Sequence, residues 1–166
     1  MKALKIVLIP ALLGLAALST CANAAEEKKI TVQQVPKPVL EAFHKAYPQA
    51  LDVKYEVEKD AGKTVYEVEF KEQGIKREAT YAAEGTLLET EEDIKPDTLP
   101  AAITEALKKS HPQATVEEAE KVMKPDGSVS GYEVEIKDGK KEFEIRLDAT
   151  GKIFKTGTEK KEGETE

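Results

Sequence analysis

The stretch "VPKPVLEAFHKAYPQA" at residues 35–50 recurs, with substitutions, as "LPAAITEALKKSHPQA" at residues 99–114. Each stretch spaces its apolar residues so that they form one stripe on a helix. Proline disfavours helical angles in the residue before it, so Pro48 and Pro112 predict where each helix ends. The sequence "PQA" is then expected to turn the chain into a strand.

The likeness between the two halves continues downstream. "YEVEFK" at 66–71 matches "YEVEIK" at 132–137, and the glycine-containing segment at 82–90 matches that at 148–156. The offset is 64 residues at the start and 66 later, so the second copy carries two additional residues in its first turn. Because similarity at a fixed period indicates a duplicated unit, we predict two tandem repeats, at 35–97 and 98–157.

After its helix, each copy alternates polar and apolar residues with a period of two. In the first copy Tyr66, Val68 and Phe70 share one face, while Glu67 and Glu69 lie on the other. Such alternation is typical of half-buried antiparallel strands. Each copy is therefore predicted to be an α-β-β-β-β unit of an α+β fold, with an antiparallel sheet and both helices packed on one face.

Some segments fit this pattern less cleanly. Arg77 interrupts the apolar side of its strand, and "TVEEAEKVM" at 115–123 is consistent with either a helix extension or an edge strand. Residues 91–98 are expected to join the copies. A run of acidic residues there is expected to belong to a solvated linker: Glu89, Glu91, Glu92 and Asp93.

The two ends of the chain are expected to lie outside the fold. Residues 1–24 combine two lysines, a short apolar run and a small-residue cleavage site, so they predict a cleaved secretory signal peptide and a periplasmic protein without a membrane span. The sequence before Cys21 leaves a lipoprotein anchored at that residue open. Residues 25–34 are expected to form a linker, and the charged tail at 158–166 to be disordered.

The composition limits the possible partners. Removing residues 1–24 takes away two of the 25 basic residues and none of the 32 acidic ones, which changes the formal net charge from −7 to −9. An acidic surface repels nucleic-acid phosphates and anionic lipid headgroups. Cys21 is the single cysteine of the chain, so after cleavage the fold must rest on core burial.

The sequence holds no recognisable catalytic or metal-binding pattern. In "GSVSG" at 127–131, Val129 stands where a nucleophile elbow needs serine. His44 and His111 are not equivalent in the repeat, and no His/Cys set has the spacing of a metal site. The sequence therefore predicts a protein that is not an enzyme and has no cofactor or dedicated metal site.

Glutamates recur on the side of the strands opposite the apolar residues. The simplest interpretation is a solvated face on which Lys54, Lys76 and Arg146 pair with glutamates across strands. The functional interpretation is a face that docks a cationic protein, or Ca²⁺, which prefers oxygen ligands but here lacks a loop motif. The candidate partner-binding residues are Glu56, Glu58, Glu67, Glu69, Glu78, Glu133, Glu135, Glu142 and Glu144.

With the helix endings "AYPQA" and "SHPQA" and the strands "YEVEF" and "YEVEI", the chain over about 35–157 resembles the PepSY-like family, which includes β-lactamase-inhibitor-like proteins. This resemblance implies an exported, non-enzymatic module that binds or inhibits another protein, such as a peptidase. Tight inhibitors need aromatic anchors on the contact face. Here the aromatic residues fall at inward positions, with Phe154 ambiguous: Phe43, Tyr47, Tyr55, Tyr66, Phe70, Tyr81, Tyr132 and Phe143.

We therefore expect an exported binding or regulatory protein that contacts an envelope protein through the acidic sheet face and the groove between repeats. The alternative is a periplasmic acidic protein that responds to Ca²⁺.

Overall fold

The computed structural model describes residues 28–60 and 62–156. The predicted signal peptide and charged tail lie outside these residues. The described part is one nine-stranded sheet with two α-helices and two short 3₁₀ helices, η1 (Val32–Gln34) and η2 (Pro96–Thr98). The predicted α+β class is confirmed.

The sheet is an antiparallel meander in which every strand pairs with the next strand along the chain. In order, the strands are β1 (Lys28–Ile30), β2 (Leu51–Asp60), β3 (Lys63–Glu72), β4 (Ile75–Ala82), β5 (Leu87–Asp93), β6 (Thr115–Met123), β7 (Val129–Asp138), β8 (Lys141–Asp148) and β9 (Ile153–Thr156).

One capping residue separates the end of each helix from the proline of "PQA". Helix α1 (Lys37–Ala46) is followed by Tyr47, and α2 (Ala101–Ser110) by His111. Both capping residues leave the helical region, with φ of −126° and −133°, and each still donates its backbone N–H to a carbonyl four residues earlier. The proline thus ends the helix where the sequence predicts.

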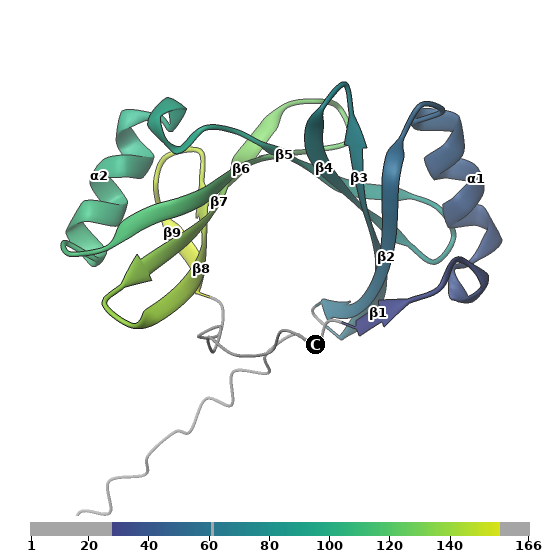
Figure 1. Ribbon diagram of the computed structural model, residues 1–166, viewed down its shortest axis with the longest axis horizontal. Coiled ribbons are helices and arrows are strands. Elements are labelled where there is room, and N and C mark those ends of the chain that lie inside the picture. Colours follow the sequence, from purple (N-terminus) through teal and green to yellow (C-terminus); the bar gives the residue numbers. More distant parts are fainter. Residues whose placement is uncertain (1–27, 61, 157–166) are drawn as a thin grey trace, which may run out of the picture.

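The sheet bends into an arch, and both helices lie on its outer, convex side (Figure 1). The inner, concave side carries no helix in the described part of the chain.

Glycines allow two turns to approach the helices closely. A Cβ on Gly85 would lie 2.5 Å from the Pro38 carbonyl oxygen, and a Cβ on Gly151 would lie 2.5 Å from the Ala102 carbonyl oxygen. Both glycines have positive φ, at +84° and +87°, which other residues rarely adopt.

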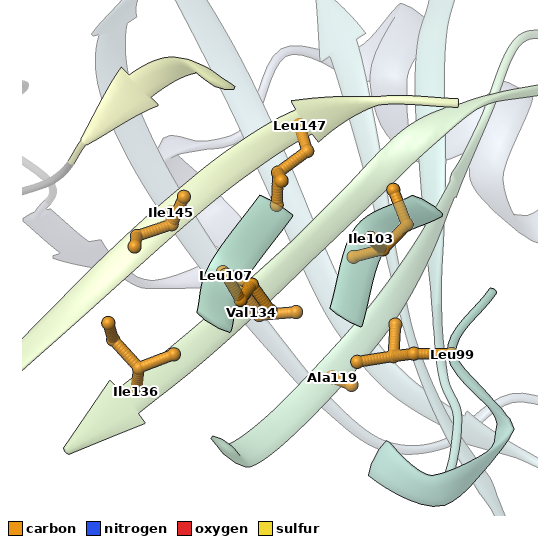
Figure 2. Packing of buried hydrophobic residues seen from close by; sticks show 8 residues of the cluster. All are labelled: Leu99, Ile103, Leu107, Ala119, Val134, Ile136, Ile145 and Leu147. Carbon is orange, nitrogen blue, oxygen red and sulfur yellow. The ribbon is translucent and has the colours of Figure 1, made fainter. Parts of the chain in front are cut away.

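Each helix covers its own hydrophobic cluster. The first cluster joins α1 to β3 and β4 through Val35, Val39, Phe43, Val68, Phe70, Ala79 and Tyr81. Figure 2 shows the second, in which residues of and before α2 pack on β6, β7 and β8: Leu99, Ile103, Leu107, Ala119, Val134, Ile136, Ile145 and Leu147. The aromatic residues expected to point inward all belong to or pack against these clusters, whereas Phe154 is 63% exposed.

The two clusters share no residue. The two helix-and-strand units, α1–β5 and α2–β9, therefore meet where β5 pairs with β6. That ladder comprises four residue pairs, from Thr90↔Met123 to Asp93↔Glu120. We call this junction the seam.

Three segments differ from the sequence-based expectation. Part of the expected linker at 25–34 is the edge strand β1, which pairs with β2, followed by η1. Part of the expected joining segment at 91–98 continues β5 as far as Asp93. Residues 115–123 form neither a helix nor an edge strand but β6, in the middle of the sheet.

A bulge explains why β6 was hard to recognise. The register shifts between Val116 and Glu118, so the strand carries one extra residue there. As a result Val116 and Ala119, three residues apart, both pack against the same hydrophobic cluster. The simple period of two is lost from the sequence.

Candidate functional site: the concave face of the sheet

Along each strand, residues of the hydrophobic core alternate with residues that point to the opposite side of the sheet. The second set lines the concave face. The structure places all nine candidate glutamates on β2, β3, β4, β7 and β8. Strand register sets several of them opposite one another: Glu56↔Glu67, Glu69↔Glu78 and Glu135↔Glu144. Like charges directly opposite are destabilising, so the face concentrates negative charge at a cost to stability.

These glutamates are half-buried rather than fully solvated. Curvature brings side chains on the inner surface of an arch closer together, and neighbouring side chains then screen one another from water. Nearby cations offset part of the charge: Lys54 Nζ lies 2.8 Å from Glu69 Oε1, and Lys137 Nζ lies 3.0 Å from Glu142 Oε1.

A denser cluster of charges lies at the seam. Arg146, on β8, donates through Nε to Glu133 of the neighbouring β7 and through its two terminal nitrogens to Glu89 and Glu91 of β5. The Nη1–Glu89 Oε1 distance is 2.8 Å. One guanidinium thus holds three carboxylates from both units of the fold.

A second cation crosses the seam beside Arg146. Lys76 of β4 reaches over β5 to Glu120 of β6, with a distance of 3.6 Å between Nζ and Oε1. We call Arg146, Lys76 and their four carboxylate partners the seam cluster: Glu89, Glu91, Glu120 and Glu133.

The expectation that the acidic run at 89–93 is a solvated linker is wrong, because Glu89, Glu91, Glu92 and Asp93 all lie on β5. Glu91 is 4% exposed, because it lies on β5 beneath Arg146. Glu120 is not recognisable from the sequence, because the bulge in β6 obscures which of its residues share a face. One signal pointed to them: Arg146 is the single arginine of residues 98–157, and it stands in a strand that also carries glutamates.

Burial and crowding shift the protonation of this cluster. Burial, and then the charge of Glu133, raise the pKa of Glu91, although Arg146 opposes the shift. Burial also raises the pKa of Glu120 to about 7, against the effect of Lys76. Burial of the Arg146 guanidinium alone would lower its pKa. The negative charges around it have the larger combined effect and raise the pKa of Arg146; they belong to Glu91, Glu133 and Glu89. Arg146 therefore stays charged, while Glu91 and Glu120 hold their protons to higher pH than an ordinary glutamate does.

The convex side of the seam is also charged. Glu92 of β5 accepts from Arg77 of β4, at 2.7 Å, and from Lys121 of β6, at 3.0 Å. Arg77 interrupts the apolar side of its strand because it serves this pairing. Charged groups thus line the junction on both faces, beside the buried Val122 of β6, which lies opposite Glu91.

The seam cluster has the composition of a cation site, but an arginine already occupies part of it. Ligand oxygens of Glu91, Glu120 and Glu133 lie within 4.8 Å of one another. Arg146 contacts two of these three residues. A metal ion would have to compete with the guanidinium for their oxygens.

Two cavities are formed by the described residues. A cavity of about 450 Å³ lies at one end of β2 and β3, and one of about 230 Å³ lies between α2 and the sheet, lined by Leu107, His111 and Ile136 among others. Glu91, the buried carboxyl group with the raised pKa, lines neither cavity.

Among the described residues no helix has the length and apolar character needed to cross a membrane.

Comparison with known proteins identifies relatives of the fold. The model of a family described as "Putative beta-lactamase-inhibitor-like, PepSY-like" matches the chain twice, over residues 23–89 and 64–155, consistent with two repeats. No curated protein matches the chain.

Three solved structures share the architecture. A protein from Bacteroides eggerthii described as "putative periplasmic" has a TM-score of 0.60 at 17% identity, and covers 75% of this chain and 88% of its own. A DUF2874 family protein from Bacteroides uniformis scores 0.57 at 20% identity with the same coverage. A BLIP-like protein from Bacteroides fragilis scores 0.52 at 21% identity, covering 79% and 92%.

The raised pKa of Glu120 predicts how stability depends on pH. A carboxyl group whose pKa is higher in the folded state contributes stability at pH values below its unfolded pKa of 4.5, and this contribution is lost as pH rises through about 7. Glu120→Gln mimics the protonated form. We expect it to raise the free energy of unfolding at pH 8.5 by about 1–3 kcal/mol, with little effect at pH 4.5, in urea denaturation followed by circular dichroism.

The matched control is Glu117→Gln, because Glu117 lies on the same strand but is exposed. It should leave stability unchanged at both pH values. Equal effects of the two variants, or a loss of stability in Glu120→Gln at pH 8.5, would contradict the assignment.

Proposed function

The chain belongs to the PepSY-like, β-lactamase-inhibitor-like family, and from this premise we propose that it is an exported, non-enzymatic protein that binds a cationic protein partner through the concave face. The observation that carries the proposal is a curved sheet face that no helix of the described chain covers and on which carboxylates outnumber cations. The proposed binding residues are Glu56, Glu58, Glu67, Glu69, Glu78, Glu133, Glu135, Glu142 and Glu144.

The chemistry of the face indicates the kind of contact. Opposite potentials across an interface steer the encounter of two proteins and favour correct partners. Phe154 is the one aromatic residue among the exposed large apolar side chains of the described residues, so aromatic anchoring contributes little. We infer a polar, salt-sensitive contact with a basic, convex surface, such as a loop or a helix rich in lysine and arginine.

The proposed location is the periplasm. It rests on the signal-peptide pattern at residues 1–24 and on relatives of the same fold that are described as periplasmic. The alternative is a lipoprotein that is anchored to a membrane through Cys21.

We also infer that the two units are tandem copies of one ancestral unit, because the family model matches the chain twice.

Site-specific crosslinking in the native cell tests the proposal. A photo-crosslinking residue is placed at Glu56 or Glu144, on the concave face, and at Glu41 or Glu105, which are exposed on the two helices. Mass spectrometry then identifies the captured proteins. We expect one basic envelope protein to be captured from both concave positions and from neither helix position.

Charge reversal supplies the matched control. Glu67→Lys with Glu135→Lys should abolish this capture, while Glu41→Lys with Glu105→Lys, the same change in net charge at equivalent positions of the two helices, should not. Capture that is equal from both sides of the sheet, or that is insensitive to reversal of the concave charges, would rule the proposal out.

The second candidate function, a Ca²⁺-responsive acidic protein, is favoured by the close approach of Glu91, Glu120 and Glu133. If it is correct, millimolar Ca²⁺ should raise the melting temperature, since a ligand that binds only the folded state stabilises it. Mg²⁺ at equal concentration is the control for ionic strength. A melting temperature that does not differ between the two ions would eliminate this candidate.

A further inference from the structure

The contacts of Arg146 span an unusual distance within the sheet. Arg146 lies on β8, while Glu89 and Glu91 lie on β5, and the strands β6 and β7 run between them. Nevertheless Arg146 donates to both glutamates on the concave side. Its side chain therefore bridges three strand spacings rather than one.

Such a contact requires curvature. Neighbouring strands lie 4.7–4.9 Å apart, so in a flat sheet β5 and β8 would be about 14 Å apart. Side chains project roughly perpendicular to the sheet and would run parallel to one another without meeting. They converge because the sheet bends toward the side on which they project (Figure 1).

Other features of the seam constrain its bend weakly. The hydrophobic clusters lie to either side and share no residue, and the β5–β6 ladder is only four pairs long. The ion pairs Lys121–Glu92 and Lys76–Glu120 also cross the seam, but each joins strands no more than two positions apart. Arg146 makes the contact that spans the most strands.

We propose that Arg146 is a positioning residue that clamps the two units at a fixed angle and thereby sets the shape of the concave face offered to a partner. The chemistry suits arginine, because its planar guanidinium carries five donors and stays charged, so it can bond three carboxylates at once. A lysine, as a point charge on a flexible stem, would not fix the same geometry. The inference rests on the proposed function for its biological purpose, but the clamp is measurable without a partner.

The distance across the mouth of the arch provides the measurement. The chain from residue 25 contains no cysteine, so Lys29→Cys and Lys155→Cys place one nitroxide label on each edge strand, at positions that are exposed. Double electron–electron resonance then gives the distribution of distances between them. The parent chain should give a single narrow distribution.

Two variants test the clamp. Arg146→Met alone leaves carboxylates without their cation, so it is expected to destabilise the fold, and a changed distance in this variant would not isolate the clamp. The triple variant Arg146→Met, Glu91→Gln, Glu133→Gln removes the guanidinium together with the two more buried of its three carboxylate partners, and should remain folded by circular dichroism. We expect its mean distance to increase by about 5 Å, one strand spacing, with a broader distribution.

The control is Lys54→Met with Glu69→Gln, which neutralises an ion pair between neighbouring strands within one unit. It should leave the distance distribution unchanged. A folded triple variant with the parent's distribution would overturn the clamp. Loss of partner capture is not used as a readout here, so failure of the clamp and failure of the proposed function are distinguished.

Discussion

The concave shape of this protein depends on one half-buried guanidinium. Arg146 gathers Glu133 from its neighbouring strand and Glu89 and Glu91 from the other unit. Because each unit has its own hydrophobic cluster, apolar packing explains the stability of each unit but not the angle between them. The charges at the seam link the two units, and the face that they shape is the one proposed to bind a partner.

This arrangement carries an energetic cost. Four carboxylates of the seam cluster face two cations, and desolvation of buried charges often exceeds the gain from pairing them. The raised pKa values of Glu91 and Glu120 express that cost. A purely apolar seam would be more stable on these grounds. The charged residues at the seam lower stability, but they give the concave face a defined curvature and an acidic surface, which the proposed function requires.

Local features of the fold were predictable from the sequence, while the charge cluster was not. Pro48 and Pro112 act on the residue beside them, and the period of two in 66–71 and 132–137 depends on neighbouring residues alone. In contrast, a bulge obscured β6, and Glu91 is buried by an arginine 55 residues away. Such a contact depends on strand order and curvature, which no local pattern encodes. The nine candidate glutamates were correctly placed on the strands, but their half-buried state follows from the same curvature.

A double-mutant cycle between Arg146 and Glu91 tests the central claim most directly. The free energies of unfolding of the parent, Arg146→Met, Glu91→Gln and the combined variant are measured by urea denaturation at pH 7. A hydrogen-bonded pair that joins the two units, with Glu91 buried and Arg146 charged, predicts a coupling energy of at least about 2 kcal/mol. A coupling energy within about 0.5 kcal/mol of zero, the range found for independent sites, would contradict the account, because the two residues would then act separately.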